Sequence, residues 1–125
     1  MKFARIIYTI AAIYGILVLA PLYFLIQRVG TDTPPAVTHP EFYYGFVGIT
    51  LLWQFVFLLI AKDPIRYRPI MVLTFFGKVA YTIPVLVLYS RGEVHASTLH
   101  LSLVDPIFGI LFVAAYLKTP KRIAA

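Results

Sequence analysis

Long runs of hydrophobic residues separated by short polar segments make up most of this sequence. The four runs each contain about 20 residues or slightly more, enough to cross a hydrocarbon core of about 30 Å as an α-helix. They cover residues 6–26, 42–61, 65–89 and 98–117. None alternates as a barrel strand does, and an open sheet cannot satisfy its backbone in lipid. The pattern predicts an all-α, membrane-spanning four-helix bundle that forms a single domain over residues 1–125.

The first run also has some features of a signal peptide. Lys2 and Arg5 precede it, and residues 18–20 (VLA) weakly resemble a cleavage site. The run is longer than a usual signal core, however, and Pro21 directly follows the point of cleavage. We therefore expect it to be the first helix of the bundle.

The polar segments between the runs carry helix-boundary signals. Thr38 and Glu41 fit a capping box, in which each side chain bonds a backbone N–H near the start of the second helix. Asp63-Pro64 is typical of an N-cap followed by proline at the first helical position. The second and third helices are therefore predicted to form a tight hairpin, whereas residues 28–37 are predicted to be irregular.

The amino-acid composition also indicates a membrane protein. Of the 125 residues, 61% are hydrophobic and 13% are charged, and the mean hydropathy is +0.87, which is too apolar for a water-soluble domain of this size. The net charge of +6 does not indicate nucleic-acid binding, because the basic residues stand at the ends of the apolar runs. The chain has no cysteine, which excludes disulfides, thiolate catalysis and Cys-ligated metals.

The distribution of basic residues predicts the orientation. With four spans, eight of them lie on the side of the two termini: Lys2, Arg5, Lys62, Arg66, Arg68, Lys118, Lys121 and Arg122. The other side has Arg28 and Arg91. The positive-inside rule therefore places both termini in the cytoplasm, and we expect a protein of the bacterial cytoplasmic membrane.

Two ionisable residues, Lys78 and Asp105, lie within the apolar runs. Such a group costs at least about 2.5 kcal/mol on insertion scales, so each is expected to face a partner or a cavity. Lys78 and Tyr81 share one helix face, and helical rise brings them near the level of Asp105, so an ion pair is geometrically feasible. Weaker polar groups in the runs are Thr50, Thr74, Tyr81, Thr82 and Ser102.

Asp105 also has a purely structural interpretation. Asp105-Pro106 repeats the Asp-Pro pattern of residues 63–64, so Asp105 could simply cap a second half-helix, or it could belong to a purely structural ion pair. Pro106 cannot bond the carbonyl of Ser102, and Pro84 frees a carbonyl on the lysine helix in the same way. Two proline breaks near two charges favour an interior polar site. Both interpretations stay open.

Other polar residues give weaker signals. Gln54, beside Trp53 on the second run, either contributes to the polar site or hydrogen-bonds neighbouring helices together. The spacing of His39, His95 and His100 makes no metal-binding face, and we expect neither a metal nor a cofactor.

Several stretches of the sequence resemble two groups of known membrane proteins. THPEFYYGFVGITLLWQ, KDPIRYRPIM and LVDPIFGILFVAAYLKTP resemble small bacterial four-helix membrane proteins with no established activity. RPIMVLTFFGKVAYTIPVL and GILFVAAYLKTP are similar to the EXPERA family, which includes the emopamil-binding sterol isomerase. The second resemblance implies a central cavity with acidic side chains that meet an amine or a carbocation-like intermediate. This chain instead has Gln54 in its second run and Lys78 as a potential counter-ion of Asp105.

Three functional hypotheses follow. In the first, the bundle holds a lipophilic or amphipathic small molecule, with membrane lipids around it. The ligand-binding residues would be Lys78, Asp105, Tyr81, Gln54 and Trp53. In the second, the protein is a noncatalytic accessory subunit of a larger membrane complex. In the third, it is a membrane isomerase with Asp105 as the catalytic acid and base.

Overall fold

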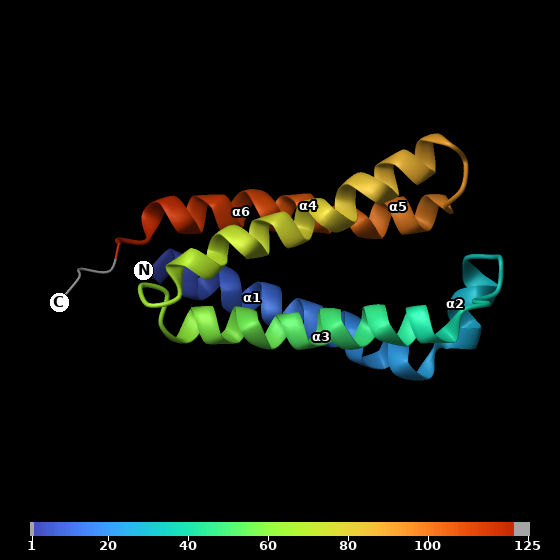
Figure 1. The fold of residues 1–125 in the computed structure, drawn as a ribbon, viewed down its shortest axis with the longest axis horizontal. Coiled ribbons are helices and arrows are strands. Elements are labelled where there is room, and N and C mark those ends of the chain that lie inside the picture. The colour runs from blue at the N-terminus through green and yellow to red at the C-terminus, as the bar shows by residue number, and fades with distance from the viewer. Residues whose placement is uncertain (1, 122–125) are drawn as a thin grey trace.

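Four long helical rods form the protein (Figure 1). The computed structural model describes residues 2–121, and every regular element in that range is a helix. In chain order they are α1 (Lys2–Leu19), η1 (Ala20–Phe24), α2 (Ile26–Asp32), α3 (Pro40–Lys62), α4 (Arg68–Ser90), α5 (Ala96–Ser102) and α6 (Val104–Lys118). The rods Lys2–Phe24, α3, α4 and Ala96–Lys118 are each long and apolar enough to cross a membrane. The prediction of four long apolar helices is therefore confirmed.

The first rod and the segment after it differ from the prediction. The α-helix ends at Leu19 and continues as the 3-10 helix η1, where Pro21 supplies no backbone N–H for an α-helical bond. The prediction that residues 28–37 are irregular is wrong for residues 28–32, because the helix α2 extends to Asp32. Within α2, the Thr31 hydroxyl donates to the Gln27 carbonyl at 3.0 Å, a local contact that the proline-rich sequence did not suggest.

The predicted capping box at the start of α3 is wrong. His39 is the N-cap residue, without a side-chain cap bond, and Pro40 takes the first helical position. The helix therefore begins one residue later than the box requires. Glu41 instead lies 3.3 Å from Nδ1 of His39.

The connection between α3 and α4 is short, as predicted, but Asp63 does not cap α4. Its Oδ1 accepts from the backbone N–H of Arg66 at 3.3 Å within a turn, and α4 begins at Arg68. The two helices also do not pack as a hairpin. α3 packs chiefly on α1 and α4 on α6, while α1 and α6 join the two pairs.

The core lies in the half of the bundle nearer the termini. Tyr8, fully buried, stacks on Phe112 with ring centroids 4.4 Å apart and nearly parallel planes, and Phe57 meets both rings edge-on. The hydroxyls of Tyr8 and Thr74 are 2.7 Å apart, which links α1 to α4. Small residues of α1, Ala4, Ala11 and Ala12, are buried in the same cluster and allow close helix approach.

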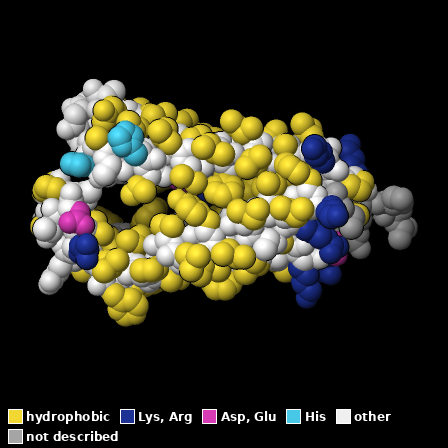
Figure 2. Space-filling view, turned by 180° about the vertical axis from the view of Figure 1, so that it is seen from behind, with side chains coloured by type: hydrophobic (Ala, Val, Ile, Leu, Met, Phe, Trp, Pro, Cys, Tyr) yellow, Lys and Arg dark blue, Asp and Glu magenta, His cyan; other side chains and the backbone are white. Residues whose placement is uncertain are grey.

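Lysine and arginine side chains gather at the end of the molecule that carries the termini and the α3–α4 turn (Figures 1 and 2). One of them, Arg68, hydrogen-bonds backbone carbonyls at the C-terminal end of α6. Its Nε donates to the carbonyls of Tyr116 at 3.2 Å and Thr119 at 2.9 Å. Its guanidinium also lies 3.8 Å from the centre of the Tyr116 ring. The predicted basic residue Arg122 lies outside the described residues. The clustering agrees with the sequence pattern on which the predicted orientation rests.

Candidate functional site: a cavity with one ion pair

An ion pair joins α4 to α6 inside the bundle. Nζ of Lys78 donates to Oδ1 of Asp105 at 3.0 Å, and the two side chains are only 17% and 23% exposed. The ammonium also lies 5.5 Å and 5.8 Å from the ring centres of Phe57 and Phe108. A carboxylate and two aromatic faces thus surround the lysine, and each is an environment that stabilises a cation away from water. The structure brings together the two residues whose pairing the sequence left open.

A helix break positions Asp105. Pro106 has no N–H to bond the Ser102 carbonyl, and the chain passes from α5 to α6 through Leu103, as the proline predicted. Asp105 lies in the first turn of α6, but the N-cap residue is Leu103, without a side-chain cap bond. The carboxylate faces Lys78 instead, so the capping interpretation is wrong for Asp105.

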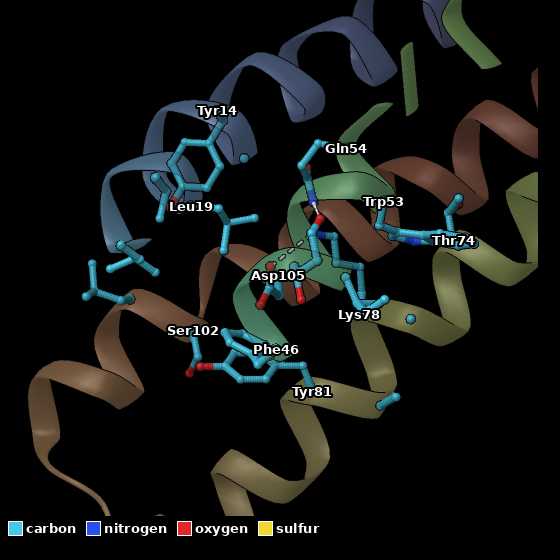
Figure 3. A pocket seen from close by; sticks show the side chains of 18 residues that line it. Tyr14, Leu19, Phe46, Trp53, Gln54, Thr74, Lys78, Tyr81, Ser102 and Asp105 are labelled. Atoms are coloured by element: carbon cyan, nitrogen blue, oxygen red, sulfur yellow. Dashed lines mark hydrogen bonds and ion pairs between the residues drawn. The ribbon is translucent and has the colours of Figure 1, made fainter. Parts of the chain in front are cut away.

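The pair lies in the wall of a cavity of about 620 Å³. All four rods contribute to this cavity, and its wall is largely apolar (Figure 3). The five residues predicted to bind a ligand, Gln54, Trp53, Lys78, Tyr81 and Asp105, all line it. Thr50, Thr74 and Ser102 line it as well, whereas Thr82 is not among the lining residues.

Gln54 has a packing role as well as a place in the wall. It is 3% exposed, and its Nε2 donates to the Thr50 carbonyl at 2.9 Å. Its side chain lies against Gly15 of α1 so closely that a Cβ atom at Gly15 would overlap Oε1 of Gln54. Gln54 therefore lines the cavity and packs against α1, whereas its hydrogen bond to Thr50 stays within α3.

Two aromatic contacts connect α3 and α4 along the cavity. The rings of Phe46 and Tyr81 stack with centroids 5.7 Å apart. Nε1 of Trp53 is 3.4 Å from the point where a Cβ of Gly77 would lie, so the indole lies close to the backbone of α4 at this glycine. Trp53 is the single tryptophan of the chain, which makes it a natural spectroscopic reporter for the cavity.

The cavity opens on the side of the bundle. Figure 2 shows the molecule hollowed nearer the end opposite the cluster of Lys and Arg side chains. Among the cavity residues, Val18 of α1 and Leu101 of α5 are 45% and 72% exposed. Both are apolar, so part of the wall continues into the apolar outer surface of the rods.

Sequence reasoning missed the contribution of the first rod. Tyr14, Gly15, Val18, Leu19 and Leu22 all line the cavity. Most of them are ordinary residues of a membrane span, and nothing in their pattern distinguishes a cavity wall from a lipid-facing surface. Gly15 carried the one usable signal, since a glycine within a long apolar helix often marks a close contact.

Two of the three histidines make local hydrogen bonds. Within residues 2–121, no group of three or more His, Asp or Glu side chains could hold a metal ion. His95 instead caps α5, with its ring Nδ1 accepting from the backbone N–H of Ser97 at 3.1 Å.

Comparison with protein-family models, with curated proteins and with solved structures finds no match for this chain. The two resemblances described above therefore stay predictions.

Proposed function

We propose that this protein is an integral membrane protein that binds a lipophilic or amphipathic small molecule in the cavity. The observation that carries the proposal is a largely apolar cavity of about 620 Å³ with one ion pair, Lys78–Asp105, in its wall. Small-molecule sites typically enclose about 300–1,000 Å³ and combine apolar walls with a few polar groups that fix orientation. The apolar part of the ligand contacts the walls, and its polar end meets the pair.

The surroundings that we propose are membrane lipids. Large apolar side chains are exposed along all four rods, among them Leu17, Ile49, Leu73 and Ile110, as lipid contact requires. The basic end of Figure 2 favours an orientation with both termini in the cytoplasm of a bacterial cell. The exposed apolar residues Val18 and Leu101 at the cavity favour lateral access from the bilayer over access from water.

The test is purification in a mild detergent, followed by native mass spectrometry of the protein with its bound molecules. Thr50→Phe places a ring in the cavity, whereas Leu52→Phe adds the same ring at a position that is 62% exposed and does not line it. We expect a retained small molecule in the wild type and in Leu52→Phe, and its loss in Thr50→Phe. Equal retention by the two variants, or no retained molecule in the wild type, would contradict the proposal.

The two other hypotheses predict different outcomes of the same experiment. An accessory subunit would co-purify with a defined protein partner and would be insensitive to Thr50→Phe. An isomerase would convert a double-bond substrate and lose that activity in Asp105→Asn. The Lys78 partner already accounts for a carboxylate among apolar residues, so the position of Asp105 does not by itself favour catalysis.

A further inference from the structure

The polar groups of the cavity differ in how much hydrogen-bonding capacity they have left. The Thr74 hydroxyl donates to the Met71 carbonyl at 2.7 Å and contacts Tyr8. The Ser102 hydroxyl donates to the Leu99 carbonyl at 2.8 Å, and the Gln54 amide nitrogen donates to the Thr50 carbonyl. The hydroxyl hydrogens of Thr74 and Ser102 are committed to bonds within the protein, whereas the Gln54 amide keeps its second N–H. A ligand therefore finds its polar partners among the remaining groups of the wall, and the Lys78–Asp105 pair is one of them.

The Lys78–Asp105 pair has unused hydrogen-bond donors and an unused acceptor. An ammonium carries three donors and a carboxylate has two oxygens that accept. Within residues 2–121, the pair uses one donor of Lys78 and Oδ1 of Asp105 for its mutual bond, and neither side chain has another hydrogen bond to the protein. The pair therefore presents free N–H donors next to a free carboxylate oxygen.

The charge of the cavity is balanced. Among the lining residues, Lys78 and Asp105 are the ones with a full charge, and the remaining polar groups are hydroxyls, phenols, an amide and the indole N–H of Trp53. A headgroup with a net charge would leave that charge unbalanced in a site whose ionic groups are mostly withdrawn from water, and a zwitterion would bring two further charges out of water, which is also costly. An uncharged headgroup avoids this cost.

We infer that the ligand is an uncharged lipid whose headgroup both donates and accepts hydrogen bonds, a lipid alcohol in the simplest case. Its hydroxyl donates to the free oxygen of Asp105 and accepts from Lys78, and its hydrocarbon chain lies along the apolar wall. This inference rests on the proposed function and specifies the chemistry of the same site.

The test measures how strongly lipids with a brominated tail quench the fluorescence of Trp53, because a bromine atom quenches a tryptophan that lies close to it. Dibrominated octadecanol, octadecanoic acid and octadecylamine share one tail and differ in the headgroup, and at about pH 8 the last two are charged in water. Each is titrated into the wild type in nanodiscs, and the quenching of Trp53 fluorescence is measured. In the matched control, Trp53→Phe with Leu52→Trp moves the reporter to a 62% exposed position outside the cavity, where quenching reports bulk lipid.

We expect the alcohol to bind the wild type at least about tenfold more tightly than the acid or the amine, which corresponds to about 1.4 kcal/mol. The methyl ether of the alcohol accepts but cannot donate, and we expect it to bind more weakly than the alcohol. Asp105→Asn leaves the lysine charge uncompensated and shifts the preference to the acid. Lys78→Met leaves the carboxylate charge uncompensated and shifts the binding preference to the amine.

The outcomes separate the two proposals. Tighter binding of the acid or the amine by the wild type would overturn the inference about the headgroup and leave ligand binding intact, as would equal binding of the alcohol and its ether. If all probes quench Trp53 no more than they quench the tryptophan of the control, the proposed function fails as well. The wild-type series alone decides the headgroup question, so the inference stays testable even if the charge variants do not fold.

Discussion

Nζ of Lys78 and Oδ1 of Asp105 lie 3.0 Å apart and connect the middle of α4 to the first turn of α6. Each charge is stabilised mainly by the other, because both side chains are largely withdrawn from the surface. The pair therefore contributes to stability, and we propose that it also binds the headgroup of the ligand.

We predict that Lys78→Met alone destabilises the protein, because it leaves a mostly enclosed carboxylate without its partner. Removing one member of a fully buried pair costs roughly 3–5 kcal/mol, and the partial exposure here reduces the expected loss to about 2 kcal/mol. Thermal unfolding in detergent measures the effect. The double change Lys78→Met with Asp105→Leu is expected to recover most of the loss. A double variant no more stable than the single one would show that the two charges are not coupled.

A second prediction concerns the contact of Gly15 with Gln54. Gly15→Ala forces a Cβ into the Gln54 side chain, so we expect a loss of about 1–3 kcal/mol, as in other overpacked interiors. Gly45→Ala is the matched control, since a Cβ there meets nothing within 4 Å and alanine favours the helix. Unfolding of both variants in the same detergent gives the comparison. Adding Gln54→Ala to Gly15→Ala should restore stability, and its failure to do so would contradict the steric explanation.

A third prediction concerns the hydrogen bond between Tyr8 and Thr74. The Thr74 hydroxyl gives its hydrogen to the Met71 carbonyl, so Tyr8 must be the donor in the 2.7 Å contact. Tyr8→Phe removes that donor but keeps the stacked ring on Phe112, and we expect a loss of about 1 kcal/mol. The same change at Tyr44, which is 38% exposed, should have little effect on the unfolding midpoint. Equal effects at both positions would contradict a role for this bond.

The proposed orientation can be tested by labelling, because the chain has no cysteine of its own. Glu93→Cys lies between α4 and α5, and Lys121→Cys lies near the opposite end. A membrane-impermeant maleimide should label Glu93→Cys in intact cells and Lys121→Cys only after permeabilisation. The reverse pattern would mean that the positive-inside argument fails for this protein.

The sequence predicted the parts of the fold that follow from local chemistry. The four apolar rods follow from run length, and the break before Pro106 follows from a missing backbone donor. The ion pair follows from the cost of leaving Lys78 or Asp105 alone among apolar residues.

The arrangement of the rods could not be predicted in the same way. The four runs are nearly equivalent in hydrophobicity, so their pairing depends on shape: α1 packs on α3 where Gly15 accommodates Gln54. The short 63–67 turn suggested a hairpin, but a tight connection does not require the two helices to pack along their lengths. The cavity arises from this pairing, and for that reason its wall from α1 had no signature in the sequence apart from Gly15.

The most direct test of ligand binding is a crystal structure of the protein grown from a lipidic mesophase, with attention to the density inside the bundle. The account predicts continuous non-protein density along the apolar wall, ending within hydrogen-bonding distance of Lys78 and Asp105. A cavity that contains only water, or that has collapsed with the rods in contact, would contradict it.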